Sequence, residues 1–290
     1  MDRHSRRRRS TWWPSCPVHS RVTLLAVTLC IGAPLSAQVP QGVVRDRAEY
    51  AEWLRTAPTS PFAAIALQRI GPGLTLGPPG SDIVLERMPQ VRVSEARGRV
   101  SLDSAGTLRV IPRDRVAALG TWRMIATGTG SRITLTVFGP PHDARMPAYF
   151  PWRAAAVDTV ELVAPTERRS VLLLSAHGTD VEAMEAGTVT VTHFGTPVTL
   201  RVRRFPGATE DESDLEINFR DGTSGQGSYP AGRFVALEPL GNGKYLLDFN
   251  RARNPFCAYN TVFPCPAPWP GNAITARVEA GETYEAAKGK

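Results

Sequence analysis

Apolar and polar residues alternate along most of the chain with the short period that β-strands require. Residues 132–137 (RITLTV) alternate strictly, which places every second side chain on one face of a strand. Gly and Pro, 25 of each, separate similar short runs along the whole length, and both residues favour turns. Gly195-Thr196 lies between two such runs and predicts a hairpin. The predicted strands are 83–85, 91–94, 98–103, 107–112, 132–137, 158–164, 169–175, 187–194, 197–204, 214–219, 232–237 and 244–249.

One segment near the beginning has the periodicity of a helix. In residues 45–57 (RDRAEYAEWLRTA), Tyr50, Trp53 and Leu54 follow the i, i+3, i+4 spacing of one helix face. The fold class predicted from both patterns is all-β and mostly antiparallel, with sandwich- or barrel-like modules and one short N-terminal helix.

A loop interrupts the strand pattern near the middle of the chain. Pro140 and Pro141 lie in residues 139–147 (GPPHDARMP), which predict an interdomain linker or a long loop. The predicted parts of the chain are a signal peptide at 1–37, an N-terminal helical segment at 38–57, a first β module at 58–140 and a second β module at 148–285.

The first 37 residues have the organisation of a secretory signal peptide. A basic cluster, Arg6 to Arg9, precedes an apolar run at 22–32 that has the length of a signal's hydrophobic region. A membrane-spanning helix needs about 20 apolar residues, and this run is shorter. Small residues follow, so cleavage is predicted after Ala37; whether residues 1–17 are translated stays open. We therefore expect an exported protein, periplasmic or extracellular, with no permanent membrane anchor.

The basic charge of the chain belongs largely to this leader. The full chain has 34 Lys+Arg and 27 Asp+Glu. Removing the leader's six arginines and one aspartate leaves 28 basic and 26 acidic residues, a net charge of +2. This balance does not favour a nucleic-acid partner, which calls for a strongly basic surface.

The most distinctive motifs of the chain lie in residues 215–281. In order, they are FRDGTSG (219–225), Tyr229, AGRF (231–234), DFNRA (248–252), Asn254-Pro255, Cys257-Ala258, Cys265-Pro266, Asn272 and EAGE (279–282). This order resembles the C-terminal signature of an uncharacterised bacterial family, the domain of unknown function 1684. Arg253 and Phe256 depart from that signature, which has an aromatic residue and a second proline there. The resemblance implies a shared fold and brings no established activity with it.

The first module resembles the same family more faintly, through TLG (75–77), SDIVL (81–85) and YFP (149–151). The first two motifs are also weakly similar to forkhead-associated domains, which bind phosphothreonine. Such binding needs an arginine directly after the glycine and a Ser-x-x-His motif. Here Pro78 and Pro79 follow Gly77. A β-sandwich with a similar strand-turn pattern is therefore the preferred interpretation.

Two cysteines remain once the leader is removed. Cys257 and Cys265 are separated by seven residues, whereas Cys16 and Cys30 lie in the leader. In an oxidising compartment, two cysteines this close are expected to form a disulfide. Free thiols are the alternative. No nearby histidine or further cysteine completes a tetrahedral metal site, so neither a metal nor another cofactor is predicted.

Polar side chains concentrate in the segment 219–254 and supply the candidate ligand site. An arginine can clamp a carboxylate or phosphate with two hydrogen bonds, so Arg233 and Arg251 are the expected anion clamps. The alternative is structural, with the Gly-rich segment as an ordinary turn and the other residues as a satisfied polar network. The candidate residues are Asp221, Thr223, Ser224, Tyr229, Arg233, Asp248, Asn250, Arg251 and Asn254.

These residues support two hypotheses about function. The first, which we favour, is a non-catalytic protein that binds a small molecule or a component of the cell envelope. The second is a hydrolase or transferase that uses the Asp, Ser and Arg residues of 219–254. A serine nucleophile needs a base, and none of His142, His177 and His193 belongs to the matched motifs.

Overall fold

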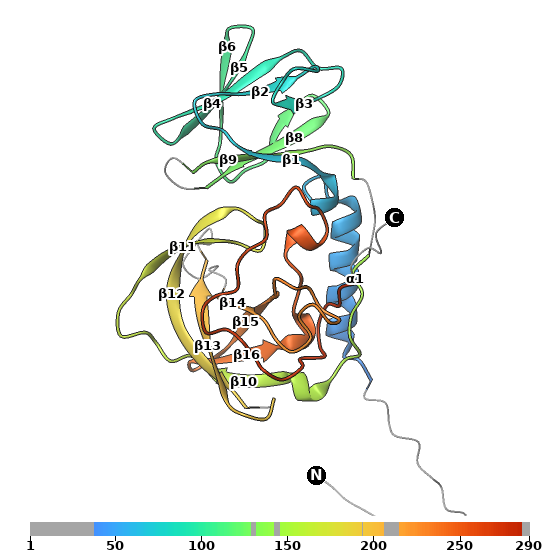
Figure 1. The fold of residues 1–290 in the computed structure, drawn as a ribbon, viewed down its shortest axis with the longest axis vertical. Coiled ribbons are helices and arrows are strands. Elements are labelled where there is room, and N and C mark those ends of the chain that lie inside the picture. The colour runs from blue at the N-terminus through green and yellow to red at the C-terminus, as the bar shows by residue number, and fades with distance from the viewer. Residues whose placement is uncertain (1–37, 129–131, 142–145, 193, 206–214, 286–290) are drawn as a thin grey trace, which may run out of the picture. The chain divides into compact units, whose positions relative to one another are not determined.

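In the part of the chain that the structure describes, the strands form three sheets, and one long helix precedes them (Figure 1). The computed structural model describes residues 38–128, 132–141, 146–192, 194–205 and 215–285. Within these residues, every strand pair except β2–β3 is antiparallel. The predicted fold class is confirmed. The predicted signal peptide, residues 1–37, lies outside the described part of the chain.

The helix α1 spans Gln41–Thr56 and begins four residues before the predicted start. Pro40 precedes it and has a proline's fixed φ, here −55°. Leu54 is fully buried, as the helical spacing predicts, whereas Trp53 on the same face is only partly covered. No helix in the described residues is long and apolar enough to cross a membrane.

Two sheets, formed by strands between residues 64 and 138, pack as a sandwich. The strand orders are β1-β9-β8-β7 and β3-β2-β4-β5-β6. Leu76 and Val93 of one sheet and Met124 and Leu135 of the other are fully buried in one apolar cluster. Each sheet therefore contributes its inner face to a shared core. The strands are β1 Ala64–Arg69, β2 Leu74–Gly77, β3 Ile83–Val84, β4 Val91–Ala96, β5 Arg99–Ser104, β6 Thr107–Ile111, β7 Ala117–Leu119, β8 Trp122–Thr127 and β9 Thr134–Phe138.

The third sheet has seven strands in the order β10-β16-β15-β14-β13-β12-β11 and curves like a barrel. Val163, just beyond β10, exchanges two 2.9 Å backbone hydrogen bonds with Thr188 of β12, on the other side of the sheet. Gly187 permits this approach, because its φ is +143° and a Cβ there would collide with the Val163 carbonyl. The strands are β10 Val157–Glu161, β11 Ser170–Leu174, β12 Asp180–Val191, β13 Val198–Arg204, β14 Leu215–Phe219, β15 Arg233–Gly241 and β16 Lys244–Asp248.

The chain after β16 packs across this sheet mainly as loops and short turns. Its Phe249 meets Phe219 of β14 edge to face, with ring centroids 5.1 Å apart, in the core of the sheet. Farther along, Arg253 forms an ion pair with Asp46 of α1 at 3.0 Å. The C-terminal segment therefore joins the sheet to the helix. Among the described residues, the 3-10 turns are η1 Pro61–Ala63, η2 Ala154–Ala156, η4 Phe249–Arg251 and η5 Phe256–Ala258.

Candidate functional site

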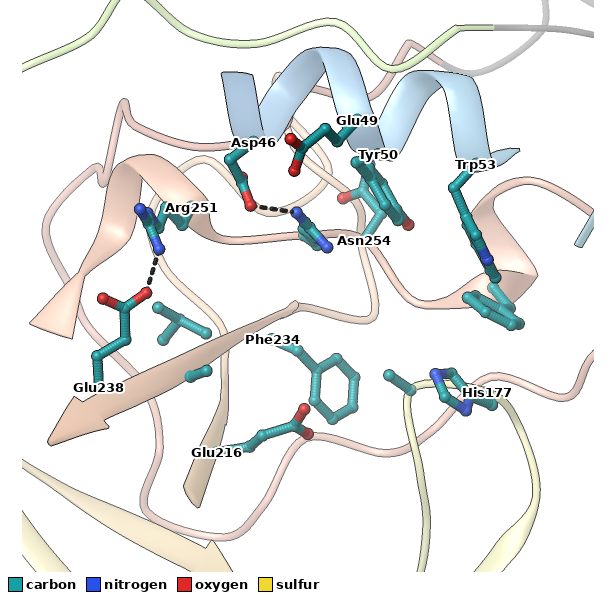
Figure 2. Close-up of a pocket in the computed structure, with 15 residues that line it drawn as sticks. Asp46, Glu49, Tyr50, Trp53, His177, Glu216, Phe234, Glu238, Arg251 and Asn254 are labelled. Atoms are coloured by element: carbon teal, nitrogen blue, oxygen red, sulfur yellow. Dashed lines mark hydrogen bonds and ion pairs between the residues drawn. The ribbon is translucent and has the colours of Figure 1, made fainter. Parts of the chain in front are cut away.

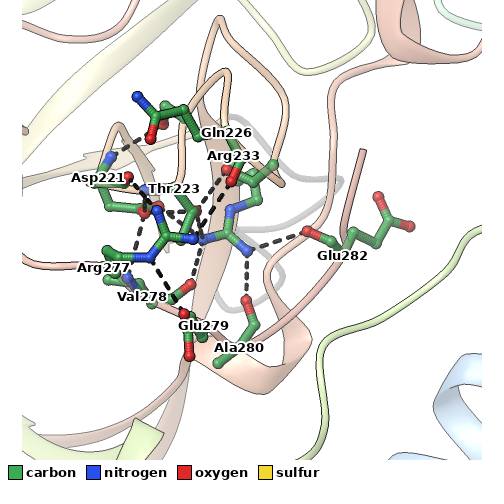
Figure 3. Close-up of polar contacts among 12 residues, drawn as sticks. Asp221, Thr223, Gln226, Arg233, Arg277, Val278, Glu279, Ala280 and Glu282 are labelled. Atoms are coloured by element: carbon green, nitrogen blue, oxygen red, sulfur yellow. Dashed lines mark hydrogen bonds and ion pairs between the residues drawn. The ribbon is translucent and has the colours of Figure 1, made fainter. Parts of the chain in front are cut away.

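Arg233, at the start of β15, is fully buried and lies at the centre of a polar network (Figure 3). Its Nη2 donates to Asp221 Oδ2 at 2.7 Å and to the Val278 carbonyl at 2.9 Å. Its Nη1 donates to the Glu282 carbonyl at 3.1 Å and to the Ala280 carbonyl. The guanidinium thus fastens the C-terminal segment to β15. Arg233 was a predicted anion clamp, but both terminal nitrogens of its guanidinium are bonded to groups of the protein.

The Gly-rich segment after β14 is a turn held by its own side chains. The Thr223 backbone N–H and hydroxyl both donate to Asp221 Oδ1 at 2.6 Å. The hydroxyl of Ser224 accepts a hydrogen bond from the Asp221 backbone N–H at 3.1 Å. Thr223 Oγ1 also lies 2.7 Å from Ser228 Oγ. These contacts match the turn that the sequence offered as the alternative to a ligand loop.

Asp248 and Asn250 form a second internal network. Asp248 Oδ1 accepts hydrogen bonds from the Asn250 backbone N–H at 2.9 Å and from its Nδ2 at 2.8 Å. The amide of Asn250 is bonded to the backbone of Arg153, through Oδ1 to N–H and through Nδ2 to the carbonyl, both at 2.9 Å. These two side chains therefore hold the turn before β10 against η4.

A cavity of about 590 Å³ lies between α1 and β15 (Figure 2). Phe234, Ala236 and Glu238 contribute to its wall from one face of β15, because alternate residues of a strand share a face. Val235 and Leu237 belong to the core on the other face, although Val235 also contributes to the lining of the cavity. The cavity is lined by Asp46, Glu49, Tyr50, Trp53, Ala176, His177, Glu216, Phe234, Val235, Ala236, Glu238, Arg251, Arg253, Asn254 and Phe256.

Arg251 and Asn254 are the predicted site residues that line this cavity. Arg251 is partly exposed and forms an ion pair with Glu238. Asn254 is buried, and its Nδ2 donates to the Thr283 carbonyl at 3.0 Å. The other seven candidates lie away from the cavity wall, so the nine residues do not converge on one pocket.

Ion pairs and aromatic rings make up much of the cavity wall. Arg253 lies over the ring of Tyr50, 3.9 Å from its centroid, and pairs with Asp46. Trp53 stacks near Tyr50 with centroids 5.9 Å apart, and Phe256 lies 6.0 Å from Trp53. The cavity can therefore offer a ligand both flat apolar surfaces and charged groups.

Behind this wall lies a buried carboxyl group, Glu282. The Tyr259 hydroxyl donates to its Oε1 at 2.6 Å, and the Asn254 backbone N–H donates to its Oε2 at 2.6 Å. Complete burial raises the pKa of Glu282 to about 7, although both hydrogen bonds and the nearby Arg253 act in the opposite direction. A carboxyl group with this pKa changes its charge near neutral pH.

Comparison with known families identifies the C-terminal half of the chain. Residues 146–283 match the model of a family described as a protein of unknown function, DUF1684. The chain belongs to the DUF1684 family. The family resemblance predicted from the motifs of 215–281 is thereby confirmed. No curated protein matches the chain. The chain is also similar to an uncharacterized protein of Haloarcula marismortui whose solution NMR structure is known, with 32% sequence identity. The match covers 47% of this chain and 75% of the Haloarcula marismortui protein, with a TM-score of 0.41.

The DUF1684 domain forms only part of the cavity. Residues 146–283 supply β15, η4 and η5, whereas α1 lies outside the matched range. The sequence missed the residues that α1 contributes, because Tyr50 and Trp53 have the spacing of an ordinary core-facing stripe. It also missed Glu282 as a site residue, although the EAGE motif of the DUF1684 signature contains it.

The two cysteines of the DUF1684 domain lie on either side of one tyrosine. The Sγ atoms of Cys257 and Cys265 are each 3.2 Å from the Tyr229 hydroxyl. Both cysteines are free thiols in the structure, so the predicted disulfide is not formed there. Burial and a hydrogen bond with Cys265 raise the pKa of Cys257 to about 12. Among the described residues, no group of three or more His, Cys, Asp or Glu side chains is placed to hold a metal.

Proposed function

We propose that this DUF1684 protein is an exported, non-catalytic binding protein, periplasmic or extracellular. Its ligand is a small molecule or a component of the cell envelope, held in the cavity between α1 and β15. One observation carries the proposal: a cavity of about 590 Å³ has both aromatic and charged walls. Ligand pockets typically measure about 300–1,000 Å³ and combine apolar surface with a few placed polar groups.

The distribution of polar contacts supports the cavity over the turn as the binding site. Arg233 and Asp221 are fully buried and paired with each other, so a ligand would have to break that pair to use either group. Arg251 and Glu238 are partly exposed and border an existing space. Binding at the cavity leaves the internal network intact.

Filling the cavity tests this proposal. Ala236 lines the cavity from an exposed strand position, so Ala236→Phe should occupy space without disturbing the core. A thermal-shift screen of exported protein against metabolites and cell-wall fragments would supply the ligand. A ligand at a concentration 100 times its Kd stabilises the folded protein by about 2.7 kcal/mol. This corresponds to a rise in Tm of about 5–10 °C.

The matched control is Ala118→Phe, at an exposed position of β7 outside the cavity wall. We expect the ligand to stabilise the wild type and Ala118→Phe and to leave Ala236→Phe unchanged. A ligand that stabilises Ala236→Phe fully would place binding elsewhere and refute the proposal.

One observation favours a hydrolase or transferase as the second candidate. Glu282 has a pKa raised to about 7, which suits a general acid or base near neutral pH. It is separated from the cavity by Arg253 and Asn254, which line the wall and act on its charge. An activity that disappears in Glu282→Gln while ligand binding persists would support this alternative over a binding protein.

A further inference from the structure

The arginines of the sandwich differ from those in the rest of the protein. Residues 58–140 contain ten arginines and five acidic residues, a net charge of +5, which leaves −3 for the rest of the chain after residue 37. No ion pair joins the described residues of this range, whereas most described arginines elsewhere pair with a carboxylate, as Arg203, Arg233 and Arg253 do. Contacts within the protein therefore do not neutralise the positive charge of the sandwich.

Three of these arginines border one groove at the edge of the five-stranded sheet. There β5 and β6 form a hairpin, and β6 is the last strand of the sheet (Figure 1). The groove measures about 410 Å³ and is lined by Arg97 and Arg99, at the turn between β4 and β5, and by Arg113, which follows β6. The rest of its lining contains no carboxylate and consists of Gly98, Val100, Val110, Ile111 and Pro112.

The two arginines of the turn are free to meet a partner. In the described part of the chain, no group pairs with or hydrogen-bonds to the guanidinium of Arg97 or Arg99, and both side chains are exposed. Arg97 has a φ of +52° in a two-residue hairpin turn, a position where Asn, Asp or Gly is usual. Arg113 donates to the carbonyl of Gly128, a neutral group that leaves the charge of Arg113 in place.

The carboxylates near this groove do not cancel its charge. Glu95 and Asp103 each accept a hydrogen bond from the backbone N–H three residues later, at 2.6 Å and 2.8 Å. Asp103 also lies beside Arg92 in the pairing of β4 with β5, and Asp114 is exposed. Against these three acidic residues, the range 92–115 carries six arginines. The local excess is therefore +3.

Two large apolar side chains project beside the arginines. Leu108 is 71% exposed, more than any other large apolar side chain in the described residues, and Val110 is 46% exposed. They alternate along β6 and so share its outer face, whereas Ile111 and its cross-strand partner Val100 are buried in the core. Val110 also lines the groove. Apolar and basic side chains thus form one continuous surface.

This combination matches the surface of an anionic membrane. Anionic headgroups attract basic residues, by about fivefold in binding for each arginine near the surface. Exposed apolar side chains gain in addition when they enter the boundary between headgroups and acyl chains. A nucleic acid would use the charge alone. A second copy of the protein would bring the same positive charge against itself.

We propose that the outer face of β5 and β6 is a docking surface for a membrane of anionic phospholipids. Arg97 and Arg99 contact the headgroups, and Leu108 and Val110 enter the boundary below them. The contact is peripheral and reversible, since two short apolar side chains fall far short of a membrane-spanning segment. It goes beyond the proposed ligand binding and is independent of it, because no residue of β4, β5 or β6 lines the ligand cavity.

Cosedimentation with lipid vesicles tests this surface. The protein is used without residues 1–37, so that the apolar run of the predicted leader cannot itself bind lipid. Vesicles of phosphatidylglycerol and phosphatidylcholine in equal parts should bind the protein at about 0.1 M salt and release it at about 1 M, where the Debye length falls from about 10 Å to about 3 Å. Vesicles of phosphatidylcholine alone should bind at least about tenfold more weakly. Equal binding to both kinds of vesicle would overturn the proposal.

Paired arginine variants locate the contact. Arg97→Gln/Arg99→Gln should weaken binding to the anionic vesicles about twentyfold, from about fivefold for each charge. The matched control is Arg168→Gln/Arg220→Gln, which removes two exposed arginines of the DUF1684 domain and should leave binding unchanged. Equal losses in the two double variants would show that net charge alone governs binding, and would refute a defined surface.

Apolar variants test the insertion. Leu108→Ser/Val110→Ser should weaken binding to the anionic vesicles about tenfold, through the loss of buried apolar area. Its control is Val163→Ser/Leu240→Ser, at two exposed apolar positions of the DUF1684 domain. If the Leu108/Val110 variant binds as tightly as the wild type while the arginine variant does not, the surface takes a soluble polyanion and the membrane assignment fails.

Two further outcomes would assign this surface to another partner. Release of the protein from anionic vesicles by glycerol 3-phosphate at constant ionic strength would indicate a site for a free phosphate ester. Absence of vesicle binding, together with a dimer in sedimentation equilibrium that Leu108→Ser/Val110→Ser abolishes, would assign the face to a second copy. Either result overturns the proposal and leaves the ligand cavity untouched. The vesicle comparison uses the unsubstituted protein, so a misfolded variant leaves it decisive.

Discussion

Arg233 has both terminal nitrogens of its guanidinium bonded to the chain itself. Its partners are the Asp221 carboxylate and three carbonyl groups of the C-terminal segment, at residues 278, 280 and 282. Burial lowers the pKa of Arg233, and the Asp221 charge opposes that shift. Such a pair is a structural anchor, since removal of one partner leaves the other charge buried without compensation.

Arg233→Ala should therefore destabilise the fold strongly. We expect a loss of about 3–5 kcal/mol in the free energy of unfolding, the usual cost of breaking a buried pair. Denaturant unfolding followed by circular dichroism would measure it. Arg251→Ala is the control; its partly exposed pair with Glu238 should be worth about 1 kcal/mol or less. Equal losses in the two variants would contradict the anchoring role.

Glu282 gives the stability of the protein a pH dependence. Its folded-state pKa, about 7, lies above the ordinary value of 4.5, so the folded state holds the proton more tightly than the unfolded state. The contribution to stability is complete below pH 4.5 and is lost as the pH rises through 7. The shift corresponds to about 3 kcal/mol across this window.

Glu282→Gln should remove that dependence. As the pH rises from 5 to 8, we expect the free energy of unfolding of the wild type to fall relative to that of the variant. Urea denaturation at both pH values would show this. Glu279 is a partly exposed neighbour, so the stability of Glu279→Gln should change with pH in the same way as that of the wild type. A constant difference between wild type and Glu282→Gln would rule out the raised pKa.

At the scale of elements, the C-terminal segment works as a connector between α1 and the seven-stranded sheet. Phe234 of β15 exchanges two 2.8 Å backbone hydrogen bonds with Arg253, and Arg253 reaches Asp46 of α1. Farther along, η5 carries Cys257, and Cys265 follows eight residues later; both thiols contact Tyr229, between β14 and β15. The segment is thus fixed at several points along its irregular path.

A disulfide between Cys257 and Cys265 remains a prediction for the protein in an oxidising compartment. Their shared contact with Tyr229 places the thiols near each other, and oxidation would close a short loop worth about 2–3 kcal/mol. Alkylation after denaturation without reductant, followed by mass spectrometry, should label neither cysteine. Denaturation matters because the buried Cys257 thiol is poorly reactive even when reduced. Two labels on protein isolated from an oxidising compartment would reject the prediction, and a reduced sample serves as the control.

At the scale of the whole molecule, the proposed ligand cavity combines parts that lie far apart in the chain. It takes its walls from α1 and from the DUF1684 domain. A smaller cavity, of about 200 Å³, shares Trp53 with it and adds side chains from β8 and β9 of the sandwich, including Ile125 and Phe138. A third apolar cluster likewise joins Phe138 to Tyr229 and Phe263. A ligand in both cavities would contact the helix, the sandwich and the DUF1684 domain together.

The sequence determined the fold class, the helix and the family, because these depend on local periodicity and on the order of motifs. It predicted the hairpin between β12 and β13, which the structure confirms. It missed β1, β2, β7 and β8. Their pairing rather than their own pattern establishes them: β1 pairs with β9, about 70 residues later in the chain, and strand preference depends strongly on such neighbours.

Only the tertiary structure decided which polar residues face a cavity. The sequence shows that apolar and polar residues alternate along β15, but not which set faces the core. A shift of the strand by one residue would exchange its two faces. The observed register buries Arg233 and turns Glu238 toward the cavity. Asp46 meets Arg253 across a separation of 207 residues. Such contacts form only when distant segments pack, so no local pattern could reveal the site.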